Sequence, residues 1–132
     1  HRLAIFSFTV DHLHYNLLVK LLNDRFGVQT RGGCACAGTY GHYLFKINPE
    51  ISKKITDRID QGDLSTKPGF VRLSIHPVMS NAEIDHCLKA IREVVRNYKV
   101  WQKDYIYDHH ANEFFHRQEK KFKLKVDQFF DF

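Results

Sequence analysis

The stretch from residue 31 to residue 42, Arg-Gly-Gly-Cys-Ala-Cys-Ala-Gly-Thr-Tyr-Gly-His, collects residue types that could do chemistry. It holds two of the three cysteines of the chain, Cys34 and Cys36, together with Arg31 and His42. No helix or strand face requires such a composition, and glycine is placed where the backbone needs unusual angles or another group comes close. The stretch therefore predicts a loop, and it is the best place in this chain to look for a functional site.

A thiol of this stretch is a candidate nucleophile. A cysteine becomes reactive when a nearby positive charge or a helix terminus lowers the pKa of its thiol. Arg31 and a helix that begins near Gly38 or Thr39 would supply both influences. On composition alone, an unreactive thiol on a flexible loop is the competing interpretation. We expect His42 to be a packing or hydrogen-bonding residue rather than a base, because nothing in the sequence orients it.

The spacing of Cys34, Cys36 and His42 also raises the question of a metal site. Zinc sites usually combine two pairs of ligands, and no second cysteine pair follows here. A disulfide between Cys34 and Cys36 would close a strained, very short loop. We therefore expect neither at this stretch. An odd count of three cysteines fits free thiols in a reducing, cytoplasmic compartment.

Arg72 is the second candidate for chemistry. Residues 70–76 read Phe-Val-Arg-Leu-Ser-Ile-His, which alternates as a strand with one apolar face and puts Arg72 and Ser74 on the other face. A guanidinium on such a face can hold a carboxylate with two parallel hydrogen bonds. A surface salt bridge is the competing interpretation.

The elements that must position these residues follow from periodicity and capping signals. Helix starts are indicated at Asp11, at Asn48-Pro49 and at the capping box that begins with Ser80, and Gly27 is typical of a helix end. Together these predict an α+β fold, a two-layer sandwich with a small, mainly antiparallel sheet and helices packed on one face. The expected elements are a strand over 3–10, a helix from Asp11 to Phe26, a strand over 28–31, helices over 39–46 and from Asn48 to about Gly62, a strand over 70–76 and a helix that starts after Ser80.

Bulk composition narrows the class of protein. A chain of 132 residues is one domain by length, and its apolar content of 43% and charged content of 27% are ordinary for a globular protein. No apolar run reaches the roughly 18 residues that a membrane span needs. The net charge of +5 is spread over the chain without a nucleic-acid-binding motif, so a solvated basic surface is expected rather than a nucleic-acid or membrane partner.

The C-terminal region is rich in aromatic residues. From Trp101 onward Tyr105, Tyr107, Phe114 and Phe115 indicate packing against another surface. The segment Lys-Phe-Lys-Leu-Lys-Val at 121–126 alternates as an amphipathic strand does. We therefore expect residues 1–100 to form the main body and residues 101–132 to form an extension of the same domain or to pack against another domain.

Three segments together resemble a known family. Residues 27–37 read Gly-Val-Gln-Thr-Arg-Gly-Gly-Cys-Ala-Cys-Ala, and residues 69–75 and 81–85 follow with Gly-Phe-Val-Arg-Leu-Ser-Ile and Asn-Ala-Glu-Ile-Asp. In this order they resemble the C-terminal small domain of class V aminotransferases, enzymes of fold type I that use pyridoxal phosphate (PLP). The resemblance covers roughly residues 3 to 98 and is greatest to cysteine desulfurases.

The resemblance implies roles for individual residues. Cys36 matches the cysteine that takes the sulfur atom of a cysteine substrate as a persulfide and releases alanine. Arg72 matches the arginine that holds the α-carboxylate of the amino-acid substrate, and Arg31 matches the loop arginine beside that site. Cys34 and His42 would be accessory residues.

The resemblance also implies what lies elsewhere. In this family the lysine that binds PLP belongs to a large domain on the N-terminal side, so PLP would be the cofactor of the complete enzyme and is not expected on this chain alone. We expect the chain to need that large domain as a partner, to be inactive without it, and to form a homodimer.

Three alternatives stay open on the sequence. The protein could be a class V enzyme without persulfide chemistry, such as an aminotransferase, a lyase or an epimerase. It could be a stand-alone interaction module that keeps the fold without catalysis. The third is a metal-binding domain that uses Cys34, Cys36 and His42.

Overall fold

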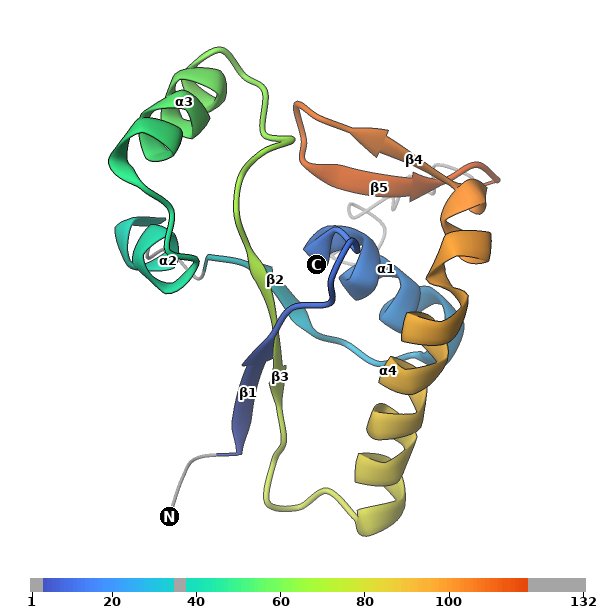
Figure 1. The fold of residues 1–132 in the computed structure, drawn as a ribbon. Coiled ribbons are helices and arrows are strands. Elements are labelled where there is room, and N and C mark those ends of the chain that lie inside the picture. Colours follow the sequence, from blue (N-terminus) through green and yellow to red (C-terminus); the bar gives the residue numbers. More distant parts are fainter. Residues whose placement is uncertain (1–3, 35–37, 119–132) are drawn as a thin grey trace, which may run out of the picture.

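The fold is that of a small α+β domain, in which two long helices cover one face of a three-stranded antiparallel sheet (Figure 1). The structure is a computed structural model that describes residues 4–34 and 38–118. The predicted fold class is confirmed. In chain order the elements are β1 (Ile5–Phe8), α1 (Tyr15–Phe26), β2 (Arg31–Gly33), α2 (Gly38–Leu44), α3 (Pro49–Asp60), β3 (Phe70–Ser74), α4 (Asn81–Trp101), the 3₁₀ turn η1 (Gln102–Asp104), β4 (Tyr105–Asp108) and β5 (Glu113–His116).

The sheet has the strand order β1-β3-β2, and both pairs are antiparallel. β3 alternates as its sequence predicts, since Val71 and Leu73 are 0% and 5% exposed and belong to the core. Arg72, between them, is half-buried on the opposite face. The strand residues that alternate with Val71 and Leu73 therefore lie on the side of the sheet away from α1 and α4, the two helices on its other side in Figure 1.

Helix α1 begins later than the sequence suggested. The prediction that Asp11 caps it is wrong, because residues 10–13 close a turn in which the Leu13 N–H bonds the Val10 carbonyl at 3.1 Å. The helix starts at Tyr15, and the Nδ1 atom of His14 accepts a hydrogen bond from the backbone N–H of Asn16. An imidazole thus fills the role that serine or aspartate usually has.

The predicted end of α1 is confirmed. Gly27 adopts a left-handed conformation with φ of 65°, and its N–H bonds the Asn23 carbonyl at 2.9 Å. The N–H of Val28 bonds back to the Leu22 carbonyl at 3.1 Å, so Val28 still belongs to the helix end. This explains why the next strand is β2 at Arg31–Gly33 and not the predicted strand over 28–31.

Helices α2 and α3 form an arm at one end of the molecule, away from α1 and α4 (Figure 1). Their predicted positions are confirmed, and Asn48 caps α3 by accepting from the Ile51 N–H at 2.8 Å. The expected apolar stripe of α3 is only partly buried. Ile55 is buried, whereas Ile51 is 49% exposed.

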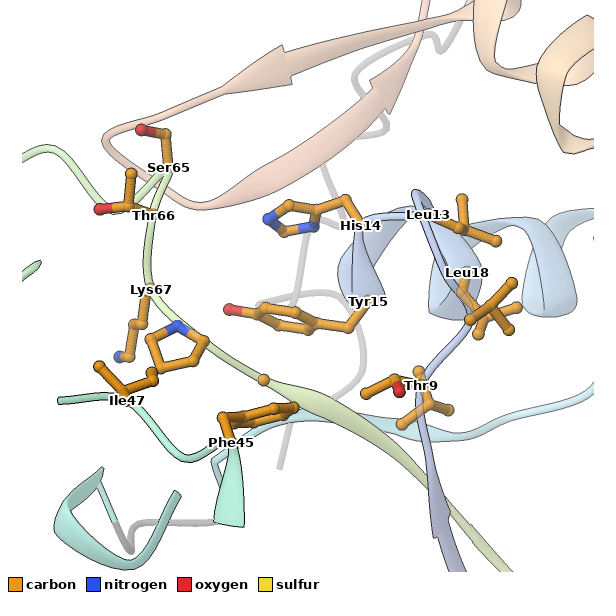
Figure 2. Close-up of a pocket in the computed structure, with 14 residues that line it drawn as sticks. Thr9, Leu13, His14, Tyr15, Leu18, Phe45, Ile47, Ser65, Thr66 and Lys67 are labelled. Carbon is orange, nitrogen blue, oxygen red and sulfur yellow. The ribbon is translucent and has the colours of Figure 1, made fainter. Parts of the chain in front are cut away.

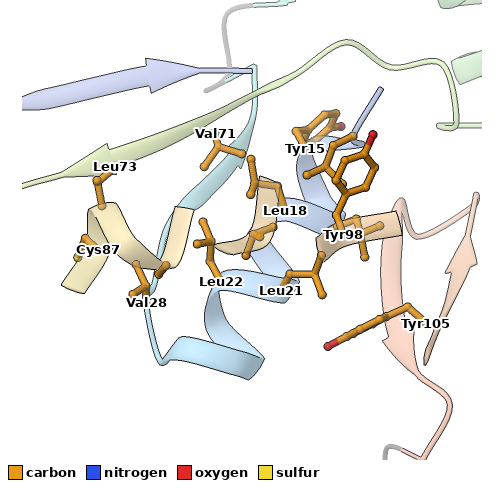
Figure 3. Packing of buried hydrophobic residues seen from close by; sticks show 14 residues of the cluster. Tyr15, Leu18, Leu21, Leu22, Val28, Val71, Leu73, Cys87, Tyr98 and Tyr105 are labelled. Carbon is orange, nitrogen blue, oxygen red and sulfur yellow. The ribbon is translucent and has the colours of Figure 1, made fainter. Parts of the chain in front are cut away.

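Helix α4 starts as predicted, with a complete capping box between Ser80 and Glu83. It packs along α1, and Cys87 lies in the buried stripe as a structural thiol. Leucines of α1 pack with Val71 of the sheet and Val94 of α4 to form the core (Figure 3). Within residues 4–34 and 38–118, no helix is long and apolar enough to cross a membrane.

The strands β4 and β5 form a hairpin that the sequence did not reveal as strands. Tyr105 is buried in the core cluster, and its hydroxyl donates to Asp24 of α1 at 3.0 Å. Arg25 of α1 pairs with Asp104 at 3.0 Å. The described part of the C-terminal extension, residues 101–118, thus packs onto α1. The predicted strand over 121–126 lies outside the described residues.

Candidate functional site

The two arginines that the sequence singled out lie side by side on the sheet. In the register of β2 against β3, Arg31 stands directly opposite Arg72. Ser7 of β1 stands opposite Arg72 on its other side. Directly opposed residues of antiparallel strands point to the same face, so these three side chains share the face that α1 and α4 leave uncovered. We call it the arginine face, defined by Ser7, Arg31 and Arg72.

Arg72 is the more enclosed of the two arginines. Its Nε atom is inaccessible to solvent and has no hydrogen-bond partner among the described residues. Arg72 also forms no ion pair within residues 4–34 and 38–118, so the salt-bridge interpretation finds no support there. A buried donor without a partner costs about 1–3 kcal/mol, which makes the position suited to an incoming acceptor.

Two glycines explain how Arg31 is brought to this place. A Cβ atom on Gly32 would lie 2.7 Å from Oδ1 of Asn16 on α1, so only glycine lets β2 approach the helix this closely. Gly33 has φ of 109°, which side-chain-bearing residues rarely adopt. The glycines of the motif therefore allow close packing and set the direction of the chain. The first residues of the motif, Arg31–Gly33, form a strand and not the predicted loop.

Cys34 is a buried thiol at the end of this strand. It is 9% exposed, its Sγ donates to the carbonyl oxygen of Pro68 at 2.6 Å, and it packs against Gly41 of α2. Burial raises the pKa of the Cys34 thiol, and the ammonium of Lys67 offsets this only in part. These features favour a structural role, because a reactive thiol needs a lowered pKa and access.

His42 contacts a neighbouring helix. Its Nδ1 atom lies 2.6 Å from the Ser52 hydroxyl, which links α2 to α3, in keeping with the packing role expected for it. Cys36, the predicted nucleophile, lies outside the described residues. The described parts of the chain contain no group of three histidine, cysteine or acidic side chains that could hold a metal ion, and the set proposed from the sequence would need Cys36.

Comparison of the chain with known protein families, curated proteins and solved structures finds no match. The proposed function therefore depends on the geometry of the chain and on the sequence resemblance.

A cavity that sequence reasoning missed lies beside Cys34. It has a volume of about 320 Å³ and is lined by the start of α1, the segment between α2 and α3, and the segment that leads into β3. Figure 2 shows the rings of His14 and Tyr15 pointing from α1 toward Thr66 and Lys67 across this space. Among the residues that the structure describes, no acidic residue lines it, and neither Arg31 nor Arg72 does. Gly69 is required here, since a Cβ atom on it would lie 2.5 Å from the Tyr15 ring.

A polar network ties this region to the hairpin. The side-chain amide of Asn112 donates to the Tyr15 hydroxyl at 2.7 Å, and its oxygen accepts from the Tyr107 hydroxyl at 2.9 Å. The amide of Asn16 donates to the Asn112 carbonyl. Asn112 is buried and has φ of 55°, a conformation that asparagine tolerates better than most residues. The only feature of the sequence that could have indicated this network is the position of Asn112 between two aromatic segments.

Proposed function

We propose that this domain binds the carboxylate of an amino-acid substrate through Arg72, with Arg31 beside it, as the small domain of a PLP-dependent enzyme of the class V aminotransferase type. The observation that carries the proposal is the cross-strand pairing of Arg31 with Arg72 on the sheet face that α1 and α4 leave uncovered. The sequence resemblance around both arginines supports it independently.

The arrangement suits a carboxylate for electrostatic reasons. Two cations in directly opposed positions repel each other, and an anion between them removes that repulsion. The planar guanidinium of Arg72 offers two parallel N–H donors to a carboxylate. Because β3 is the central strand, bonded on both sides, it holds Arg72 more firmly than an edge strand or a loop would.

The strand residues of the arginine face do not by themselves fit PLP. In register with Arg72 and its neighbours, this face carries two serines, an isoleucine, a glycine and a phenylalanine, namely Ser7, Ser74, Ile5, Gly33 and Phe70. None is a lysine that could bind the cofactor covalently, and none is an acid that could pair with its ring nitrogen. We therefore derive no step through PLP from this chain, and the lysine belongs, in the proposal, to another part of the protein.

The reaction we favour is sulfur removal from cysteine. In balanced form, cysteine and the Cys36 thiol give alanine and a Cys36 persulfide, so that the C–S bond of the substrate breaks and an S–S bond forms. The buried, hydrogen-bonded state of Cys34 argues against Cys34 as the sulfur acceptor. Of the two cysteines of the motif, Cys36 is then the one to test.

The test uses the natural protein as its gene encodes it. We expect it to bind PLP, detected by visible absorption. We expect Arg72→Ala to raise KM for the amino acid about 10- to 100-fold with the PLP content unchanged, as loss of a charge-assisted bidentate contact implies. Arg92→Ala, on the exposed side of α4, is the matched control and should leave KM unchanged.

Three results would contradict the proposal, at two levels. A natural protein without PLP, or an Arg72→Ala variant with unchanged KM, overturns the carboxylate-binding role. A Cys36→Ala variant that releases sulfide from cysteine at the full rate overturns the persulfide step alone and leaves a class V enzyme without that chemistry.

A further inference from the structure

The cavity beside Cys34 combines polar groups on one side with apolar walls on the other. Its volume of about 320 Å³ is at the lower end of the range in which proteins bind small molecules. Phe45 and Ile47, from the segment between α2 and α3, line it together with the fully buried Leu18 and Val71. These walls suit a compact ligand with an apolar part.

The two polar rings at the start of α1 present hydrogen-bond donors to this space. Nδ1 of His14 accepts from the Asn16 N–H, so the neutral imidazole carries its hydrogen on Nε2. This Nε2 atom is buried and has no hydrogen-bond partner among the described residues. The Tyr15 hydroxyl accepts from Asn112 at 2.7 Å, and within residues 4–34 and 38–118 no group accepts its own hydrogen. Each ring therefore ends in a donor that is left for a ligand.

The two donors point the same way and keep their hydrogens at neutral pH. The rings of His14 and Tyr15 are stacked, with centroids 4.6 Å apart and an angle of 24° between their planes. Both extend across the cavity toward Thr66 and Lys67 (Figure 2). Burial lowers the pKa of His14, so the ring stays neutral, and burial raises the pKa of the Tyr15 hydroxyl. Two parallel donors of this kind match the two oxygens of one carboxylate.

The charge of the cavity also favours an anion. Lys67 is the one residue with a formal charge among the described residues that line it. Its ammonium forms no ion pair in the described part of the chain. A cation beside two donors, without an acidic side chain between them, attracts a negative group.

We propose that this cavity binds a small organic carboxylate with an apolar body. One carboxylate oxygen accepts from Nε2 of His14 and the other from the Tyr15 hydroxyl, while Lys67 supplies the compensating charge. The apolar body lies against Phe45 and Ile47. Such a ligand gives the buried Nε2 donor the partner that it lacks within the described residues.

The test follows the His14 ring by NMR in the natural protein with isotope-labelled histidine, and benzoate is the probe. The Nε2 resonance of His14 should shift on titration, with a Kd for benzoate of about 1 mM or lower. Benzamide keeps the ring but lacks the charge, and acetate keeps the carboxylate but lacks the apolar body. Each should bind at least about tenfold more weakly than benzoate.

Two pairs of variants connect this binding to the cavity. Tyr15→Phe removes one donor and should weaken benzoate binding about tenfold. Tyr107→Phe is its matched control, because it also removes a hydroxyl that bonds Asn112 but does not line the cavity. Lys67→Met should weaken binding about two- to fivefold, as expected for a solvent-exposed charge. Lys89→Met, on the exposed side of α4, should leave it unchanged.

A further variant separates this inference from the proposed function. The cavity is lined by neither Arg31 nor Arg72, so Arg72→Ala should leave the affinity for benzoate at His14 unchanged. If Arg72→Ala abolishes the His14 shift and Tyr15→Phe does not, benzoate binds at the arginine face, and the inference is wrong while the proposed function stands.

Three other outcomes would overturn the inference. They are the absence of a His14 shift at about 10 mM benzoate, equal affinities for benzoate and benzamide, and equal effects of Tyr15→Phe and Tyr107→Phe. The first would mean that the cavity takes up solvent alone.

Discussion

Arg31 of β2 and Arg72 of β3 are directly opposed cross-strand partners on the sheet face that α1 and α4 leave uncovered. Like charges that stand directly opposite each other on antiparallel strands destabilise a sheet. The buried Nε atom of Arg72, which has no hydrogen-bond partner in the described part of the chain, adds to that cost. The arginine pair that would bind a carboxylate thus lowers the stability of the fold.

The first prediction is that Arg72→Met stabilises the isolated domain. Methionine keeps the unbranched apolar stem and removes both the repulsion and the unpartnered donor. We expect the free energy of unfolding to rise by about 1 kcal/mol in urea denaturation at low salt, with a smaller gain at high salt. Arg92→Met on α4 is the control and should change little. A loss of stability at both salt concentrations would contradict the account of the pair.

The second prediction concerns Asn112, which holds the hairpin to α1. Asn112→Gly keeps the left-handed backbone but removes both side-chain hydrogen bonds, which leaves the Tyr15 and Tyr107 hydroxyls without this partner. We expect a loss of about 2 kcal/mol in the free energy of unfolding. Ala111→Gly, an exposed position in the same turn, measures the entropic effect of a glycine alone.

A double-mutant cycle sharpens this prediction. If Asn112 acts through Tyr15, then Tyr15→Phe and Asn112→Gly should be coupled by roughly 1 kcal/mol, as contacting residues usually are. Strict additivity of the two changes would show that the hydrogen bond at 2.7 Å contributes little.

Local signals in the sequence predicted much of this fold because the interactions that set them are local. Gly27, Asn48 and Ser80 each satisfy backbone groups within a few residues, and all three are found in the predicted role. The alternation around Arg72 needs only the period of a strand and one apolar layer beneath it.

The features that sequence reasoning missed depend on distant partners. His14 takes the capping position because the turn before it delays the helix, and this turn was not visible as a pattern. β2 starts at Arg31 because its partner is β3, some 40 residues further along. The hairpin is stabilised by Asn112 through contacts with α1 almost 100 residues away. The sequence predicted Arg31 and Arg72 as separate candidates. That they stand directly opposite each other follows only from the register of β2 against β3.

The third prediction is that the Cys34 thiol reacts slowly. Burial raises its pKa, and its hydrogen atom is donated to the Pro68 carbonyl. In a Cys36→Ser background, alkylation of Cys34 by iodoacetamide at neutral pH should be at least about tenfold slower in the folded protein than in urea. Peptide mass spectrometry distinguishes this cysteine from Cys87. Equal rates in both states would mean that Cys34 is accessible and competes with Cys36 as the nucleophile.

The fourth prediction is an acid-dependent loss of stability that arises from His14. Its imidazole is enclosed by the rings of Tyr15, Tyr107 and Phe114, and burial lowers its pKa below the usual value of 6.5. Since Nδ1 accepts from the Asn16 N–H, a second proton would remove that acceptor and charge a buried ring. The unfolded chain therefore binds this proton more readily, and the free energy of unfolding should fall as the pH drops below about 6.5.

Two variants isolate this contribution. His14→Asn supplies a capping side chain that does not titrate, and it should reduce the loss of stability between about pH 6.5 and pH 5. His12→Asn is the matched control, because His12 is exposed and its φ of 62° is one that asparagine tolerates. An NMR titration of the His14 ring gives the pKa directly, and a value at or above 6.5 would contradict the prediction. If both variants have the same pH dependence as the unmodified protein, the acid sensitivity has its origin in other groups.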